Sequence, residues 1–230
     1  MLIRAKFQKL NPVKYISHLE LMNTFRRSFR RAELPVAYSK GYNPHIKLSL
    51  CQPLSVGMVG KAEYFDIELS ERISTEKFVI KLNKNIPSAV EVLTARQVPE
   101  NIKSLMAVVN TAVYNIDFKI NDKSTSQKLA DEFLAADEIK ITRLRRNKED
   151  RIIDLRPMIY DLIVCENGNW QFTVSTGSRG NVRATELVRA VSEKYPEISI
   201  VPITCIVREG MYVKKGDKYY QPFADKVVGR

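Results

Sequence analysis

The chain has 230 residues, enough for one large domain or two small ones, and 44% of them are hydrophobic, so a core can form. Its net charge of +11 and its pI near 9.5 favour a polyanionic partner, above all nucleic acid, although they do not determine the fold. No apolar run approaches the roughly 18 residues of a membrane-spanning helix, and we recognise no signal peptide. We therefore expect a cytoplasmic protein with no membrane partner.

The first 98 residues predict a ferredoxin-like unit, because their elements are expected in the order strand, helix, strand, strand, helix, strand. Alternating apolar and charged residues predict the strands, and apolar residues at three- and four-residue steps predict the helices. The expected ranges are 2–13, 18–32, 46–50, 64–69, 74–87 and 90–95. A link to the second half is expected near 99–104.

The helix at 18–32 is the most informative of these elements. Ser17 and Glu20 match a capping box, which predicts that the helix begins at His18. We expect a core stripe of Leu19, Met22, Phe25 and Phe29. Four arginines are then expected on an exposed side, because residues four apart share a face: Arg26, Arg27, Arg30 and Arg31. Their guanidinium groups repel one another, which favours a polyanionic partner.

A loop rich in glycine, tyrosine, asparagine and proline follows this helix at 39–45. With the residue before it, the loop carries Tyr38, Lys40, Tyr42 and His45. Residues 1–47 hold ten Lys or Arg against two Asp or Glu, and they also hold both histidines of the chain. Basic and aromatic side chains are therefore concentrated at this end of the protein.

Residues 105–230 predict a second ferredoxin-like unit with one extra strand and a C-terminal tail, so we expect an α+β fold of two tandem units. The expected strands are 112–120, 139–145, 151–164, 170–175 and 198–207, and the expected helices are 125–136 and 181–194. Pro157 interrupts one strand, which indicates a bulge or an edge position. Residues 166–169 (Glu-Asn-Gly-Asn) predict a hairpin turn.

The three cysteines, Cys51, Cys165 and Cys205, lack the close spacing of a zinc or iron–sulfur site. Each has apolar neighbours, so we expect small buried side chains in strands. Their odd number and the absence of a recognised signal peptide favour a reducing compartment. We expect neither a metal nor another cofactor.

These features predict RNA binding, because arginines hold phosphates and tyrosines stack on bases in many α+β proteins that bind RNA. The predicted contact residues are Arg26, Arg27, Arg30, Arg31, Tyr38, Lys40, Tyr42, His45, Arg143, Arg145 and Arg146. One alternative is a metal-independent endoribonuclease that uses His18 or His45 as acid or base. The sequence contains no Walker A loop, dinucleotide-binding glycine motif, serine-hydrolase elbow or zinc-protease motif.

Several motifs carry a family resemblance: Ser17-His18-Leu19-Glu20-Leu21-Met22, the arginine helix to Ala32, Leu34-Pro35, the loop 38–45, Glu63-Tyr64-Phe65-Asp66-Ile67 and Asp154-Leu155-Arg156-Pro157. Together they resemble the bacterial radical-SAM-linked family, an uncharacterised domain found beside or fused to radical SAM proteins. The resemblance implies partnership with a radical SAM enzyme and supplies no chemistry of its own. The chain lacks the Cys-x-x-x-Cys-x-x-Cys cluster motif, so it is not itself the radical SAM catalyst.

Taken together, the residues and the resemblance predict an accessory protein that presents structured RNA, either tRNA or ribosomal RNA, to a partner radical SAM enzyme. A second alternative follows from the same resemblance. In it the chain is a protein-interaction module that docks on that enzyme without binding RNA.

Overall fold

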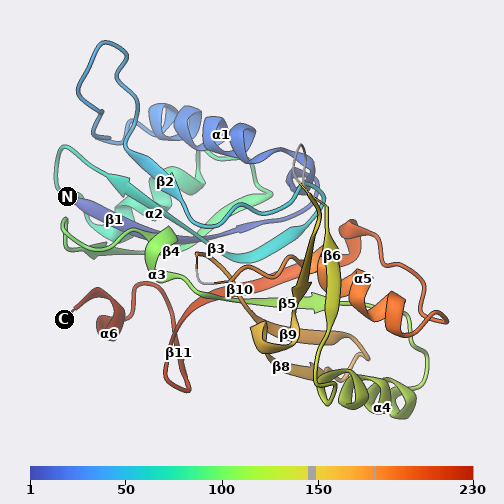
Figure 1. The fold of residues 1–230 in the computed structure, drawn as a ribbon. Helices are drawn as coiled ribbons and strands as arrows, with labels where there is room; N and C mark the ends of the chain where they lie inside the picture. The colour runs from blue at the N-terminus through green and yellow to red at the C-terminus, as the bar shows by residue number, and fades with distance from the viewer. Residues whose placement is uncertain (145–148, 179, 230) are drawn as a thin grey trace. The chain divides into compact units, whose positions relative to one another are not determined.

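The computed structural model describes residues 1–144, 149–178 and 180–229, and it has the α+β architecture predicted from the sequence (Figure 1). The chain forms two compact units. Unit 1 comprises Met1–Asn110 together with Gly210–Arg230, and unit 2 comprises Thr111–Glu209. Within the described residues, no helix combines the length and the apolarity needed to cross a membrane.

Unit 1 begins with the predicted order of elements: β1 (Leu2–Lys9), α1 (His18–Arg31), β2 (Leu48–Leu50), β3 (Val59–Glu68), α2 (Thr75–Asn83) and β4 (Val90–Val98). A short 3-10 turn, η1 (Val13–Tyr15), precedes α1, and α3 (Leu105–Val108) follows β4. β1 pairs antiparallel with both β3 and β4, and β2 pairs antiparallel with β3. The element order is therefore confirmed, whereas the assignment of ferredoxin-like units stays a prediction.

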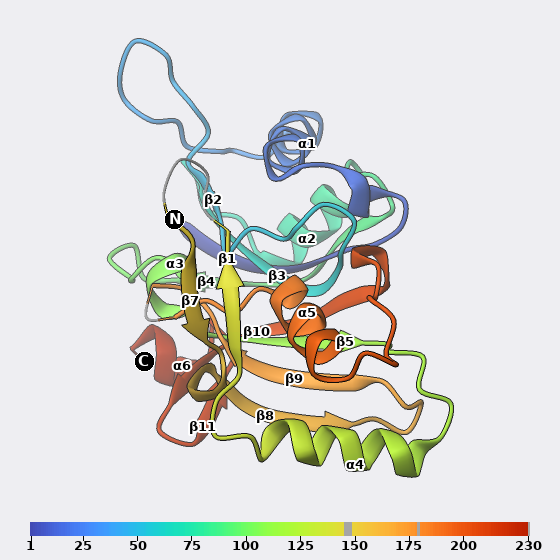
Figure 2. The same ribbon diagram turned by 45° about the vertical axis from the view of Figure 1, so that its right-hand side comes forward.

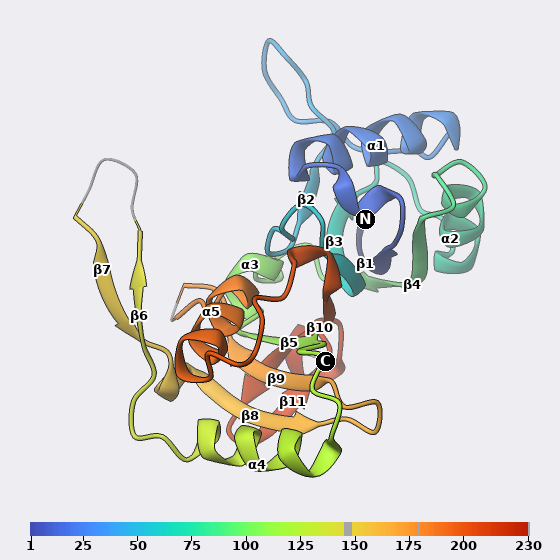
Figure 3. The same cartoon turned by 90° about the vertical axis from the view of Figure 1, so that its right-hand side faces the viewer.

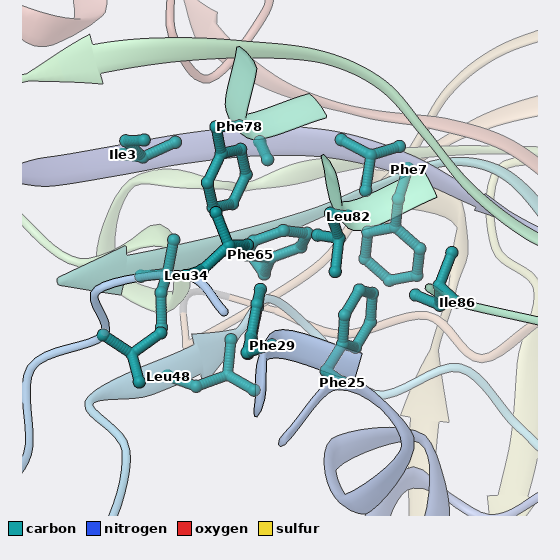
Figure 4. Packing of buried hydrophobic residues seen from close by; sticks show 14 of the residues in the cluster. Ile3, Phe7, Phe25, Phe29, Leu34, Leu48, Phe65, Phe78, Leu82 and Ile86 are labelled. Carbon is teal, nitrogen blue, oxygen red and sulfur yellow. The ribbon is translucent and has the colours of Figure 1, made fainter. Parts of the chain in front are cut away.

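Helices α1 and α2 pack against one face of this sheet through an aromatic core, shown in Figure 4. Phe7 of β1 and Phe65 of β3 are buried in this core. Each lies on the side of its strand that alternate residues share. Phe25 of α1 lies between them, with ring centroids 5.0 Å from Phe7 and 4.8 Å from Phe65. Phe29 and Phe78 extend the cluster towards α2.

The predicted capping box at the start of α1 is confirmed. Ser17 Oγ accepts a hydrogen bond from the Glu20 backbone N–H at 3.2 Å, and Glu20 Oε2 accepts one from the Ser17 N–H at 3.1 Å. The predicted core stripe is wrong at its first residue, because Leu19 is 65% exposed and Leu21 is buried in its place. The helix therefore begins as predicted but presents an apolar side chain to solvent in its first turn.

The opposite face of the sheet is covered by the last residues of the chain. They form the end of β10 (Ile206–Lys215), then β11 (Lys218–Tyr220) and α6 (Asp225–Val228). A second buried cluster joins these elements to the sheet, and it comprises Cys51, Tyr64, Leu105, Val109, Met211, Val213 and Phe223. The predicted division placed this tail in a second domain at 105–230, whereas the structure places Gly210–Arg230 in unit 1.

Unit 2 contains β5 (Thr111–Ile116), α4 (Lys123–Leu134), β6 (Lys140–Arg143), β7 (Arg151–Asp154), β8 (Ile159–Val164), β9 (Trp170–Ser175), α5 (Ala184–Lys194) and the first residues of β10. β9 pairs antiparallel with both β5 and β8. The predicted hairpin turn is confirmed between β8 and β9, where Gly168 has a φ of 81°. β6 and β7 form a separate two-stranded sheet, which Figure 3 shows.

Two expected strands of unit 2 differ from the structure. The predicted interruption at Pro157 is confirmed, but it divides the range 151–164 into two strands, β7 and β8, separated by the 3-10 turn η2 (Arg156–Met158). The range 198–207 is mostly irregular: a 3-10 turn, η3 (Ile203–Cys205), lies within it and β10 begins only at Ile206.

The cysteine prediction holds only in part. Cys51 is buried in unit 1, Cys165 is half-buried, and Cys205 is exposed, so only the first is a fully buried side chain. Within the described ranges, no group of three or more His, Cys, Asp or Glu side chains is arranged to hold a metal ion.

Candidate nucleic-acid interface

The outer surface of α1 presents two exposed arginines, Arg27 and Arg30, which we call the arginine face. Phe25 and Phe29 anchor one side of the helix in the core, and Arg27 and Arg30 are exposed. In the part of the chain that the structure describes, neither guanidinium group makes a hydrogen bond or an ion pair. The helix therefore holds two positive charges that no described residue neutralises.

The other two predicted arginines of α1 are tied to the protein. Arg31 is exposed, but its Nη2 donates hydrogen bonds to Ser28 Oγ at 3.2 Å and to the Asn85 carbonyl at 2.6 Å. Arg26 is half-buried, and its Nη1 donates to Asn23 Oδ1 at 3.1 Å. They lie beside the arginine face and add charge to it, with fewer donors left for a ligand.

A loop of residues 38–46, which we call the projecting loop, extends away from the rest of unit 1 (Figures 1 and 2). Its base is closed by a β-bridge between Tyr38 and Ile46. Inside the bridge, Ser39 N–H donates to the His45 carbonyl at 2.8 Å, and His45 N–H donates to Ser39 Oγ at 3.0 Å. The ends of the loop are thus held together while its tip is free.

The projecting loop carries the predicted aromatic and basic side chains. Tyr42 is 100% exposed, Tyr38 is 43% exposed, and Lys40 and His45 are also exposed. Gly41 has a φ of 126°, a backbone conformation that favours glycine, so it sets the bend that turns the chain at Tyr42. The predicted loop residues therefore all lie at the surface, with Tyr42 touching nothing else in the fold.

The base of this loop is anchored to the sheet. The Ala37 N–H donates to the Glu68 carbonyl at 2.8 Å, and the Lys47 N–H donates to the Ala37 carbonyl at 3.0 Å. Lys47 Nζ also pairs with Glu68 at 2.8 Å. Because the loop begins shortly after α1 ends at Arg31, unit 1 carries the arginine face and the loop on one short stretch of chain.

His18 occupies a different environment from His45. It lines a small pocket of unit 1 together with buried polar groups of β1 and β3, including Lys9, Glu63 and Tyr64. Burial lowers the pKa of His18 below its ordinary value of 6.5, and the positive charge of Lys9 lowers it further. Burial also raises the pKa of the Tyr64 phenol, so that it stays protonated.

The pocket beside His18 is tightly filled. Lys9 Nζ donates to the Ile16 carbonyl at 3.0 Å, just before α1 begins. The Glu63 carboxylate lies over Gly60, where an added Cβ would be 2.7 Å from Glu63 Oε1. The enclosed space has room for about one water molecule. His45 does not line this pocket, so the structure does not bring the two histidines into one site.

The arginines of unit 2 that were predicted to contact RNA do not form an exposed patch among the described residues. Arg143 is engaged internally: its Nε and Nη2 donate to the two oxygens of the buried Glu186 carboxylate, each at 2.6 Å, and Nη2 also donates to the Asn181 carbonyl at 2.8 Å. Arg145 and Arg146 lie outside the described residues.

The charge count of the N-terminal segment also includes buried groups that sequence reasoning missed. Of its basic residues, Arg4, Lys9 and Lys14 are buried. Arg4 pairs with Asp66, and Lys9 lines the His18 pocket. For Arg4 and Lys9 of β1, alternation does not show which face of the strand is covered. Lys14 lies in the turn η1, outside any strand pattern.

Comparison with known proteins identifies a family, and the description of that family names no activity. The family described as "Uncharacterized protein conserved in bacteria (DUF2344)" matches residues 2–184. A search of curated proteins found no match.

Proposed function

We propose that this chain, which belongs to the uncharacterised bacterial family DUF2344, is an RNA-binding protein whose arginine face holds phosphates. The observation that carries the proposal is the pair of exposed guanidinium groups of Arg27 and Arg30, which have no partner among the described residues. Their position three residues apart separates them by roughly 4.5 Å along the helix axis. Two such groups can engage neighbouring phosphates of one strand, each through paired N–H donors.

The charge of the whole chain supports this assignment. Because the chain has a net charge of +11, long-range electrostatic attraction adds to the direct contacts that favour binding of a polyanion. Among the described residues, no carboxylate forms an ion pair with the arginine face, whereas Arg4 and Arg143 are both paired with acidic side chains inside their units. Arg4 and Arg143 are thus neutralised within the fold, whereas Arg27 and Arg30 are left for an external anion.

The wider role that we propose rests on the family resemblance. In this role the chain presents structured RNA, tRNA or ribosomal RNA, to a partner radical SAM enzyme, and each of its halves is a ferredoxin-like unit. The chain supplies the phosphate contacts, and the partner supplies the chemistry.

Purification without nuclease, followed by sequencing of co-purified RNA across a salt series, tests the proposal. We expect a defined RNA species whose retention falls steeply with salt, because phosphate binding releases counterions. Protein that is free of RNA even at low salt would contradict the proposal. It would favour the alternative of a module that docks on a protein partner.

A charge-matched pair of variants locates the surface. Arg27→Ala/Arg30→Ala should weaken binding of bulk bacterial tRNA and lower the salt slope by roughly 1.5, because two phosphate contacts are lost. The control Lys123→Ala/Lys128→Ala removes the same charge from exposed positions of α4 in unit 2. Equal affinities of the two variants would rule out the arginine face as the contact surface.

Metal-independent RNA cleavage is the weaker candidate. The lowered pKa of His18 keeps the imidazole neutral near pH 7, as a general base requires. However, the pocket beside it has room for about one water molecule, which is too little for a phosphodiester group. Turnover of RNA in the presence of a chelator, abolished by His18→Ala and retained by His45→Ala, would establish this activity.

A further inference from the structure

We infer that the projecting loop binds an unpaired nucleotide of the RNA, with the ring of Tyr42 stacked on the base. The inference rests on the proposed RNA binding and names the class of RNA that unit 1 selects. That class is RNA in which at least one base near the phosphates held by α1 lies outside a duplex, as in a hairpin loop, a bulge or a single-stranded end.

The first argument is the exposure of Tyr42. Its side chain is 100% exposed in the described part of the chain, so the ring contributes nothing to the core of unit 1. An aromatic side chain buries roughly 150–250 Å² when it is covered, and it prefers stacked or edge-on aromatic neighbours. A nucleobase offers a flat aromatic face of matching size, and stacking on it is tolerant of base identity.

The second argument is that the loop is built to hold Tyr42 away from the fold. The Tyr38–Ile46 bridge and the Ser39–His45 hydrogen bonds close its base, and the contacts of Ala37 and Lys47 with Glu68 attach that base to the sheet. Ordering the base in advance lowers the entropy that binding must offset. The tip thus presents its ring from a fixed support.

The third argument concerns charge. The projecting loop, residues 38–46, contains Lys40 and His45 and no acidic residue, so the loop attracts the same polyanion as α1. Lys40 directly precedes the Gly41–Tyr42 bend and can reach a phosphate beside the stacked base. This combination of a cation and an aromatic ring is the one that single-stranded nucleic acid binding requires.

An unpaired base is favoured over duplex RNA for a geometric reason. Bases inside an A-form helix are stacked on both faces, and the major groove is too deep and narrow for side chains to read. The face of a base becomes available to Tyr42 only where the base leaves the helix. Arg27 and Arg30, in contrast, contact phosphates of paired and unpaired RNA alike.

Binding of two labelled RNAs to the full chain tests the inference. One is a stem–loop with an unpaired loop, and the other is a fully paired duplex with the same number of phosphates. Tyr42→Ala should weaken stem–loop binding by about 5- to 140-fold, which corresponds to the roughly 1–3 kcal/mol of a base–aromatic stack. It should leave duplex binding unchanged, and Tyr42→Phe should bind both RNAs like the native chain.

Two further variants separate the possible results. Tyr219→Ala removes another exposed tyrosine, 42% accessible, from β11 and should change neither affinity. Arg27→Ala/Arg30→Ala should weaken both RNAs. If the arginine variant does so while Tyr42→Ala leaves stem–loop binding unchanged, the inference fails and the proposed function stands. If the native chain binds neither RNA, both fail, and a protein partner becomes the occupant of the loop.

Discussion

Arg4 is completely buried, and its guanidinium group donates to four oxygen atoms. Two belong to the Asp66 carboxylate, each at 2.8 Å, and the others are the carbonyls of Pro222 at 2.9 Å and Lys103 at 3.1 Å. Removing one partner of such a pair leaves an uncompensated charge away from water, which costs far more than losing a surface pair.

We therefore expect Asp66→Ala to lower the free energy of unfolding by about 3–5 kcal/mol, measured by urea denaturation. Lys47→Ala breaks the Lys47–Glu68 pair, whose side chains are 43% and 38% exposed, and should cost less than about 1 kcal/mol. Similar losses in the two variants would show that Arg4 does not depend on Asp66. Replacing Arg4 and Asp66 together by apolar residues should recover much of the loss.

His18 gives the protein a pH dependence whose sign follows from its environment. Its folded-state pKa lies below the unfolded value of 6.5, because burial and Lys9 disfavour the charged form. As the pH decreases, the unfolded state therefore binds a proton at a higher pH than the folded state does. The free energy of unfolding consequently falls as the pH decreases through 6.5. In His18→Gln this part of the decrease should disappear between pH 7.5 and about 5.5.

Urea midpoints at the two ends of that pH range provide the measurement. His45→Gln, which replaces an exposed histidine on the projecting loop, serves as the control and should keep the native pH dependence. The same dependence in His18→Gln as in the control would mean that His18 is not perturbed by folding. Carboxylate titrations affect both variants equally and do not obscure the comparison.

At the scale of elements, α1 depends on the cap at its start. Ser17 and Glu20 satisfy two backbone N–H groups that the helix would otherwise leave without partners. Ser17→Ala should lower the free energy of unfolding by about 1 kcal/mol, measured in urea. Ser104 occupies the same position before α3 but makes no side-chain capping bond, so Ser104→Ala should cost clearly less. Equal costs would contradict a role for the Ser17 cap.

The elements that could be predicted are those whose signals are local. A capping box and a proline after residue 34 define both ends of α1 within a few residues. Alternation indicates β1 and β3, but β1 ends at Lys9 and β3 begins at Val59, so the expected bounds 2–13 and 64–69 are wrong at one end each. The interruption of the range 151–164 at Pro157 was predictable, but the end of β7 at Asp154 was not. Asp154 Oδ1 accepts hydrogen bonds from the Ile139 N–H at 2.8 Å and from the Arg156 N–H at 3.0 Å. A contact with residue 139 is not visible in the local pattern.

The candidate site, too, could be predicted only where the signals are local in the sequence. The exposure of Arg27, Arg30 and Tyr42 follows from helical spacing and loop composition, both of which are local. The hydrogen bonds of Arg31 and Arg143 could not be predicted from local signals, because their partners Asn85 and Glu186 lie 54 and 43 residues away in the sequence. The sequence therefore predicted which helix or strand carries each charged residue. Whether that residue is paired could be seen only in the structure.

At the scale of the whole chain, the last residues complete the first unit. Phe223 is 6% exposed, and its ring packs edge-on against Tyr64 of β3 at a centroid distance of 5.7 Å. The Arg96 guanidinium lies over the same ring at 5.3 Å, and the Pro222 carbonyl accepts a hydrogen bond from Arg4. The C-terminal segment is thus part of the packing of β1, β3 and β4.

Phe223→Ala should consequently destabilise the chain by about 3 kcal/mol, because deleting a buried aromatic ring removes its transfer free energy and leaves a cavity. Circular dichroism in urea measures the loss, and Tyr219→Ala, at an exposed position of β11, should change stability far less. Native stability of Phe223→Ala would show that the tail does not pack on the sheet. A large loss of stability with unchanged RNA affinity under folding conditions is the expected result, since Phe223 supports the sheet while the proposed RNA contacts lie on α1 and the projecting loop.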